Sequence, residues 1–166
     1  IKVAPTLLDT AKALEYIGGR NIKCFGESNG EIYLHPYGGY YLDDYFYEWD
    51  INGSVNDTIS DLNAGTYTYT VRDVIGCEYP GSLTLTEPEV MDLTDSIVVV
   101  GCSGGQDGKV FATTTGGSNN YLYSWEGFQV EKYFVEEDSI IGLAQGEYFV
   151  WVYDENYCTD HMDTWI

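Results

Sequence analysis

The feature that most restricts how this chain can fold is an internal repeat. The segment LNAGTYTYTVRDVIGC, residues 62–77, returns as LAQGEYFVWVYDENYC, residues 143–158, and matched residues are 81 positions apart. Matched residues are Leu62, Gly65, Tyr67, Val71, Asp73 and Cys77 with Leu143, Gly146, Tyr148, Val152, Asp154 and Cys158. A repeat of this length predicts two similar domains of about 80 residues each, since one repeat usually forms one structural unit.

Other matched residues extend the repeat towards the N-terminus. Cys24 recurs as Cys102, Asn29-Gly30 as Asp107-Gly108 and Gly38-Gly39 as Gly116-Gly117, each after 78 positions, and Trp49 recurs as Trp125 after 76. Because the spacing changes only between these residues, insertions and deletions are expected in loops. The predicted domains are residues 1–88 and 89–166, with Glu87-Pro88-Glu89 as a stiff joint.

Each copy has the pattern of β-strands. Tyr67, Tyr69 and Val71 alternate with threonines and Arg72, which is typical of a strand with one buried and one solvated face. Asn-Gly, Asp-Gly and Gly-Gly pairs mark tight turns between such segments. Short strands separated by regular turns predict an all-β fold of two tandem Ig-like β-sandwich domains.

One segment has two readings. Residues 5–19, PTLLDTAKALEYIGG, could form a helix capped by Thr6 and ended by Gly18-Gly19. By position in the repeat, however, the same residues correspond to the first strand of the second copy. Both readings are open at this stage.

The net charge excludes several partners. Twenty-seven acidic residues and seven basic ones give a formal charge of −20. Such a surface repels nucleic acid and anionic membranes, and no apolar run is long enough for a membrane-spanning helix. The acidic residues are therefore expected either to solvate the surface or to bind Ca²⁺.

The cysteines are expected to stabilise the domains. Cys24 and Cys77 bracket the first copy, and Cys102 and Cys158 bracket the second. Four cysteines allow three pairings, and the symmetry of the repeat favours one disulfide within each domain. Free buried thiols are the alternative, and disulfides would indicate an oxidising compartment.

The ordered pattern CFGESNGEI, GG, YFYEW, AGTYTYTVRD, IGC and LTLTEP over residues 20–89 resembles the SprB-type repeat of large surface adhesins in gliding Bacteroidota. A second, weaker copy begins at CSGGQDGKV, departs from the pattern at ENYC and stops before any Glu-Pro. The resemblance implies a protein exported by the type IX route to the bacterial cell surface, with a role as stalk or adhesive module and without catalytic residues.

The same resemblance suggests glycosylation. Exported proteins of this group carry glycans at Asp-Ser or Asp-Thr followed by a small or aliphatic residue. Matching tripeptides place candidate sites at Thr10, Thr58, Ser96 and Ser139, expected in exposed segments leading into strands or in loops. Alternatively, each Asp caps a turn through its own backbone.

Signals for catalysis or metal binding are weak. The only histidines are His35 and His161, and no zinc-type cysteine or histidine spacing is present. We therefore expect no enzymatic activity, no cofactor and no metal, with the exception that Ca²⁺ could bind at the joint. Its ligands there would come from Glu87, Glu89, Asp92 and Asp95.

The two copies differ on one strand face. Thr68, Thr70 and Arg72 of the first copy correspond to Phe149, Trp151 and Tyr153 of the second. If the register holds, the second domain has an outward aromatic stripe, which either contacts another molecule or is covered by the longer segment FQVEKYFVEED.

The ends of the chain suggest self-assembly. The chain ends at HMDTWI without a counterpart of LTLTEP, and residues 1–5 resemble the tail of a closing strand. Ile1, Lys2, Val3 and Ala4 could therefore complete the sandwich of a neighbour and build a filament. The sequence thus predicts a non-enzymatic adhesive or structural module of the cell surface. A head-to-tail filament subunit and a carbohydrate-binding module are the alternatives, and the partners are other copies or repeats, surface ligands or glycans.

Overall fold

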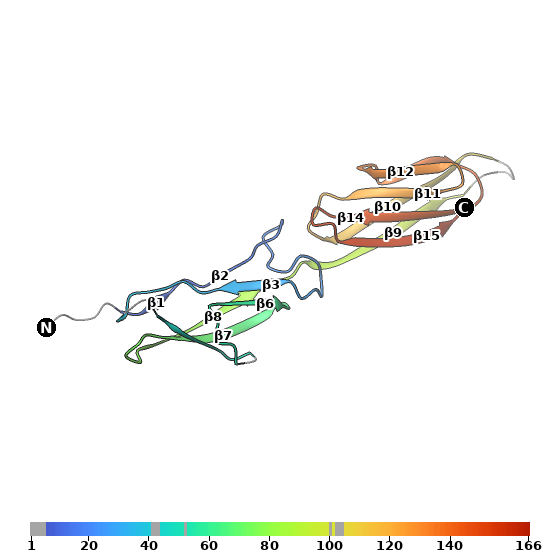
Figure 1. The fold of residues 1–166 in the computed structure, drawn as a ribbon. Coiled ribbons are helices and arrows are strands. Elements are labelled where there is room, and N and C mark those ends of the chain that lie inside the picture. Colours follow the sequence, from blue (N-terminus) through green and yellow to red (C-terminus); the bar gives the residue numbers. More distant parts are fainter. Residues whose placement is uncertain (1–5, 41–43, 52, 100, 102–104) are drawn as a thin grey trace. The chain divides into compact units, whose positions relative to one another are not determined.

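A computed structural model describes residues 6–40, 44–51, 53–99, 101 and 105–166. These residues form β-strands joined by turns, and none of them lies in an α-helix. The chain divides into two compact units, Ile1–Glu87 (unit 1) and Pro88–Ile166 (unit 2). Each unit consists of strands in facing layers (Figure 1). The division lies one residue before the boundary expected from the repeat.

Unit 2 is a sandwich of seven antiparallel strands. One sheet has the order β13-β10-β9 and the other the order β12-β11-β14-β15. The strands are β9 (Glu89–Val98), β10 (Gly108–Gly117), β11 (Leu122–Gly127), β12 (Val130–Val135), β13 (Ser139–Leu143), β14 (Glu147–Tyr153) and β15 (Thr159–Trp165). Val110, Trp125 and Val150, all fully buried, belong to the core between the two sheets. Three strands facing four is an Ig-like arrangement, as the sequence predicts.

Unit 1 repeats this plan with a more broken first layer. That layer contains the sheet β2-β3-β6 and the pair β1-β4, and the facing layer is β5-β7-β8. The strands are β1 (Leu8–Asp9), β2 (Lys12–Ala13), β3 (Gly30–Tyr33), β4 (Pro36–Tyr37), β5 (Phe46–Trp49), β6 (Thr58–Leu62), β7 (Gly65–Arg72) and β8 (Glu78–Leu85). A separate core forms here around Ile32, Trp49 and Val71.

The helix considered for residues 5–19 is wrong. Leu8–Asp9 pairs with β4 and Lys12–Ala13 pairs with β3, so this segment supplies the first strand of unit 1. Gly18 and Gly19 then form a turn with positive φ. Pairing with a neighbouring strand outweighs the local helix preference, because propensities of a few tenths of a kcal/mol per residue yield to tertiary contacts.

The repeated aspartates hold two turns together at one end of each unit. The Asp73 carboxylate accepts hydrogen bonds from the backbone N–H groups of Tyr40 (2.8 Å), Ile75 (3.1 Å) and Cys77 (2.8 Å). Asp154 accepts the corresponding bonds from Ser118, Asn156 and Cys158, each at 2.9 Å. The repeated Asp thus joins the Gly-Gly turn to the hairpin that follows it.

The first glycine of each Gly-Gly pair is required by geometry. Gly38 and Gly116 have φ of 79° and 78°. A Cβ atom at either position would overlap a carbonyl oxygen, that of Thr6 in unit 1 or that of Val90 in unit 2. Only glycine combines this positive φ with such a close approach of two chain segments.

The repeated Tyr and Trp side chains also have matching roles. The Tyr67 hydroxyl donates to the carbonyl of Asn63, and the Tyr148 hydroxyl donates to that of Ala144, both at 2.9 Å. This is the tyrosine corner of Ig-like sandwiches, in which the hydroxyl bonds the backbone a few residues upstream. The indoles of Trp49 and Trp125 are buried in the two cores.

Unit 2 has its own closing strand, contrary to the expectation from the sequence. β15 pairs with β14 from Tyr153–Thr159 to Glu147–Trp165. The last residue, Ile166, is buried and exchanges two backbone hydrogen bonds with Gly146. HMDTWI therefore corresponds to PGSLTL of β8.

Candidate functional site

The outer face of β14 is aromatic. Phe149, Trp151 and Tyr153 alternate with Tyr148, Val150 and Val152 on this strand. Since the latter three are buried in the core, the former three lie on the opposite surface of the sheet. The register predicted from the repeat is confirmed.

Neighbouring strands add further rings to this surface. On β15, His161 lies opposite Trp151, and Trp165, 64% exposed, lies opposite Glu147. Residues two apart on a strand share a face, so Trp165 faces the same way as His161. We call the outer surface of the sheet β12-β11-β14-β15 the aromatic face, with the residues Phe134, Phe149, Trp151, Tyr153, His161 and Trp165.

The rings of the aromatic face are packed against one another. The imidazole of His161 stacks on the indole of Trp151, with centroids 4.4 Å apart and planes inclined by 14°. Phe134 packs against Tyr153 at a centroid distance of 4.9 Å. Phe149 is 39% exposed and Phe134 55% exposed, whereas Trp151 and Tyr153 are half-buried. These contacts hold the rings in place while leaving apolar surface in contact with water.

The segment that could have covered the stripe instead extends it. Residues 130–135 form β12, an edge strand paired with β11. Of this strand, Phe134 contacts Tyr153, and its backbone N–H donates to the Ser124 hydroxyl at 3.2 Å. The repeat pattern did not place Phe134, His161 or Trp165 on this surface. The alternation of His161 and Trp165 in HMDTWI was the available signal, and it needed the pairing of β15 with β14.

Carboxylates surround the aromatic face. Glu126 on β11 and Asp163 on β15 are both directly opposite Phe149. The Glu126 carboxylate, together with loss of hydration and with Glu131, raises the pKa of the Tyr133 hydroxyl. The surface therefore combines apolar ring faces with hydrogen-bond acceptors of negative charge.

The corresponding face of unit 1 is mainly polar, with Phe46 as an exposed ring opposite Arg72. Arg72 of β7 forms salt bridges with Glu48 (3.3 Å) and Glu78 (2.9 Å) on the adjacent strands. The hydroxyls of Thr66 and Thr84 are hydrogen-bonded at 2.8 Å. Two units with the same strands thus present chemically different outer faces.

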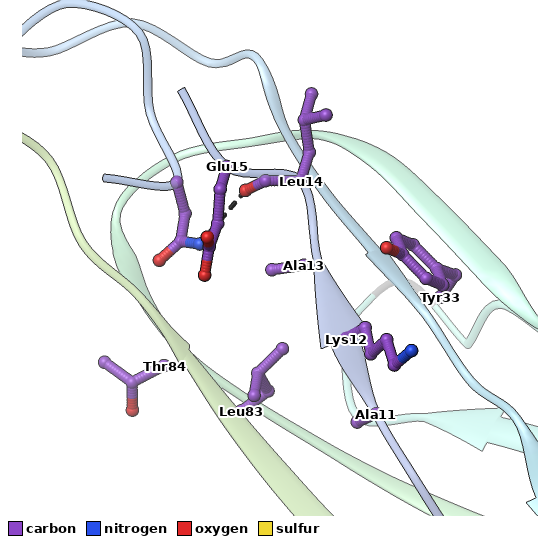
Figure 2. A pocket seen from close by; sticks show the side chains of 9 residues that line it. Ala11, Lys12, Ala13, Leu14, Glu15, Tyr33, Leu83 and Thr84 are labelled. Carbon is purple, nitrogen blue, oxygen red and sulfur yellow. Dashed lines mark hydrogen bonds between the residues drawn. The ribbon is translucent and has the colours of Figure 1, made fainter. Parts of the chain in front are cut away.

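A cleft of about 600 Å³ opens in unit 1 between β2 and β8 (Figure 2). Lys12, Glu15, Tyr33 and Thr84 are among its lining residues, and the Asn21 side-chain amide donates to the Leu14 carbonyl beside it at 3.0 Å. The described lining contains no histidine, cysteine or second carboxylate.

The expected disulfide between Cys24 and Cys77 is wrong. Cys24 and Cys158 are each disulfide-bonded, whereas Cys77 is a free, exposed thiol. Cys102 lies outside the described residues.

The positions of Cys24 and Cys77 in unit 1 explain why these two cysteines are not bonded to each other. Cys77 directly precedes β8, whereas Ile22 and Gly26 are hydrogen-bonded to Thr86 and Glu87, just beyond the other end of β8. An eight-residue strand is about 23 Å long, and bonded cysteines have Cα atoms about 4.4–6.8 Å apart. Cys24 and Cys77 therefore lie at opposite ends of the sandwich.

The four candidate glycosylation sites lie on or beside strands. Thr10, between β1 and β2, is exposed, and its hydroxyl donates to the His35 carbonyl at 3.3 Å. Ser96 is exposed within β9, while Thr58 and Ser139 are half-buried first residues of β6 and β13. Thr58 and Ser139 are thus strand residues and do not lie in loops as expected. Glycosylation itself stays a prediction.

Two further sets of predicted residues are the N-terminal interface segment and the Ca²⁺ ligands. Ile1, Lys2, Val3 and Ala4 lie outside the described residues. The carboxylates considered for Ca²⁺ do not assemble in the structure: within the described chain, no group of three or more His, Cys, Asp or Glu side chains is arranged to hold a metal ion. One of them, Glu87, accepts a hydrogen bond from Gly26 N–H at 2.8 Å.

Comparisons with known proteins identify the repeat. Residues 94–129, from β9 to the turn before β12, match the family described as the SprB repeat. The match therefore covers part of unit 2. Unit 1 shares with unit 2 its glycine turns, its aspartate and its tyrosine corner, but the family match lies in unit 2.

The other comparisons do not identify a family for this chain. No curated protein matches the chain. A solved structure described as "Structural basis for Dscam isoform specificity" aligns with 98% of this chain and 46% of its own, at 14% identity and a TM-score of 0.35. Among the described residues, no helix is long and apolar enough to cross a membrane.

Proposed function

We propose that this chain is a non-enzymatic, extracellular module of a bacterial surface adhesin, in which the aromatic face of unit 2 binds uncharged glycans. The observation that carries the proposal is that this face is exposed and aromatic in the unit with the SprB match, and mainly polar in unit 1. A difference on the same face of a duplicated fold is not needed for folding, so it points to binding.

The chemistry of the face favours a sugar. A pyranose ring has an apolar C–H face that packs on an aromatic ring, and its hydroxyl edge donates hydrogen bonds to carboxylates. Phe149 lies between Glu126 and Asp163, so both kinds of contact are available at one point. Rings at Phe149, Trp151 and Tyr153 follow one another at about 6.7 Å along the strand, enough for a short oligosaccharide.

The charge disfavours other partners. With a formal charge of −20, the chain repels acidic glycans and nucleic acid. A peptide that adds a strand needs the free edge of a sheet, whereas the aromatic rings project from its face. An uncharged oligosaccharide is not repelled by the acidic surface and does not need a free sheet edge.

A swap between the units tests the proposal. In Phe149→Thr/Trp151→Thr, the outer residues of β14 become those of β7, where Thr68 and Thr70 are already compatible with the strand. Binding of cellulose and chitin oligosaccharides, measured by calorimetry on the full chain, should be lost in this variant. The matched control Thr68→Ala/Thr70→Ala in unit 1 should bind as the unaltered chain does.

Several outcomes would count against glycan binding. Absence of binding to every uncharged oligosaccharide, or binding that survives the threonine swap, contradicts it. Stronger binding to a polyuronate such as alginate would also contradict it, because the carboxylate rim should repel acidic sugars. A change from oligomer to monomer in the swap variant would assign the face to self-association.

The surface location is tested separately. The disulfide-bonded state of Cys24 and Cys158 is consistent with an oxidising, extracellular environment. Antibodies against the chain should label intact cells that make it, and a protease added outside those cells should remove the label. Glycans at Thr10, Thr58, Ser96 or Ser139, which we also propose, would add mass to the corresponding peptides of that native protein.

A further inference from the structure

Cys77 and Cys158 occupy the same place in the two units. Each ends a turn in which the preceding aspartate, Asp73 or Asp154, accepts the cysteine N–H, at 2.8 and 2.9 Å. In the same turns the aspartate N–H donates to the cysteine carbonyl, at 3.0 and 3.1 Å. The backbone conformation of the two turns therefore matches at the cysteine.

The bonding state of these two residues is different. Cys158 is disulfide-bonded and only 8% exposed, whereas Cys77 is free and exposed. A position that forms a disulfide in one copy of the fold has the geometry to form one in the other. Cys77 is thus an equivalent site without its partner.

The partner of Cys77 is not within unit 1. Cys24 is the only other cysteine of that unit, and it is already disulfide-bonded. Unit 1 therefore contains no free thiol with which Cys77 could pair.

The surroundings of Cys77 are suited to contact with protein. Val74, Ile75 and Tyr40 lie on or beside this turn and are exposed, Ile75 by 61%. The turn of unit 2 has Glu155 and the buried Asn156 after its aspartate. Exposed apolar side chains around a free thiol favour a protein partner over solvent.

We propose that Cys77 forms a disulfide bond with a cysteine of a neighbouring repeat, so that successive repeats are joined covalently end to end. The neighbour is either a second copy of this chain or an adjoining repeat of a longer parent protein. In both cases the group that Cys77 meets is a cysteine thiol of a similar sandwich.

The reaction is a thiol–disulfide exchange with a low-molecular-weight disulfide such as oxidised glutathione. The Cys77 thiolate attacks one sulfur of that disulfide and releases one glutathione thiol. The second cysteine then attacks the mixed disulfide, forms the bond between repeats and releases the other glutathione thiol. Two cysteine thiols are oxidised, one glutathione disulfide is reduced, and two protons pass to the released thiolates.

The local electrostatics make the finished bond durable. Loss of hydration at the sulfur, and then the negative charge of Asp73, raise the pKa of the Cys77 thiol. A thiolate of higher pKa is a poorer leaving group, so it is displaced more slowly from a disulfide. The raised pKa also slows formation of the disulfide at neutral pH, so the test uses mildly alkaline conditions.

The deciding experiment uses the native protein from the surface of the cells that make it. Thiols are blocked with iodoacetamide at lysis, and a non-reduced peptide map is recorded by mass spectrometry. The Cys77 peptide should be linked to a cysteine peptide of another repeat. Cys77 recovered in the alkylated form, capped by a small thiol, or linked to Cys24 overturns the proposal.

The isolated full chain then distinguishes the two sources of the partner. After incubation with oxidised glutathione at mildly alkaline pH, a ladder on a non-reducing gel identifies a second copy, whereas a monomer together with the native linkage identifies an adjoining repeat. Cys77→Ser should abolish any ladder. As a control, Ser82→Cys in the Cys77→Ser background places an exposed thiol elsewhere, on β8. If this variant restores the ladder, any exposed thiol can cross-link by random collision, and the proposal fails.

Discussion

Unit 1 and unit 2 have the same turns and the same buried Trp, Tyr and Asp residues, and they differ on their surfaces and at one place in the core. The shared residues have matching contacts, such as the hydrogen bonds of Asp73 and Asp154. The outer face of β14 and the state of the cysteines differ. Residues that repeat thus maintain the sandwich, and residues that diverge are where function is to be sought.

The core difference involves one pair of facing positions on adjacent strands, Tyr69 and Gly81 in unit 1 and Val150 and Met162 in unit 2. In unit 1, Tyr69 lies opposite Gly81, where a Cβ atom would overlap the phenol ring, and both carboxylate oxygens of Asp9 are buried. Burial, and then the Asp9 carboxylate, raise the pKa of the Tyr69 hydroxyl. In unit 2, Val150 lies opposite Met162 and the core is apolar. A large aromatic side chain in one unit is thus accommodated by the glycine that faces it.

The largest effect is expected from truncating a buried tryptophan. Trp125→Ala should destabilise unit 2 by about 3–5 kcal/mol, because it leaves a cavity in the core. Trp151→Ala, on the outer face, should cost much less. Thermal unfolding followed by circular dichroism measures both. If Trp151→Ala proves the more costly, the assignment of inner and outer faces is wrong.

Removing the aspartate of unit 2 should have the next largest effect. Asp154→Ala leaves the N–H groups of Ser118, Asn156 and Cys158 without their acceptor, at a cost of about 2–4 kcal/mol. Asp163→Ala, on the rim of the aromatic face, is the matched control and should be nearly neutral. Chemical denaturation gives both values, and equal values would contradict the role of Asp154 as a clamp.

The paired core positions predict a coupling. Gly81→Met introduces the residue of unit 2 and should destabilise unit 1 by about 1–3 kcal/mol, because its Cβ meets the Tyr69 ring. In the Tyr69→Val background the same substitution should be tolerated much better. A double-mutant cycle measures the difference. Additive effects would mean that the two positions do not compensate each other.

Acid should weaken unit 1 through Asp73. Its hydrogen bonds, that from Tyr40 first, hold the carboxylate pKa below the ordinary value of 3.8. The stabilisation is therefore complete above that value and is lost as the pH falls towards the lower pKa of the folded state. Unfolding midpoints recorded across this acid range should fall for the unaltered chain and fall less for Asp73→Asn. Identical acid sensitivity of the two proteins would exclude this contribution.

The smallest effect on stability is expected for the swap on the aromatic face. Phe149→Thr/Trp151→Thr should change the free energy of unfolding by less than about 1 kcal/mol, since threonine suits an exposed strand position. Glycan binding should nevertheless disappear. A large loss of stability would indicate that these rings belong to the core.

Much of each sandwich could be predicted from the repeat. The alternation of Tyr67, Tyr69 and Val71 placed a strand correctly, and the Gly-Gly pairs marked turns, because strand period and positive φ are local properties. The outward register of Phe149 followed from the same alternation. By contrast, residues 5–19 carried a helical signal that only pairing with β3 and β4 overrides.

The cysteines and the full aromatic face could not be predicted in this way. Symmetry suggested a bond between Cys24 and Cys77, but sequence spacing does not measure distance, and a full-length strand separates them. Likewise, Phe134 reaches Tyr153 only because residues 130–135 form β12 at the sheet edge.

The amino-acid sequence by itself determined the duplication, the strand periodicity, the turn glycines and the acidic charge, since these depend on neighbouring residues or on composition. The tertiary structure alone decided which strand ends meet, and so which cysteines can bond. It also decided which rings from three strands share one surface. Those outcomes depend on contacts between segments far apart in the chain, whose energies local patterns do not contain.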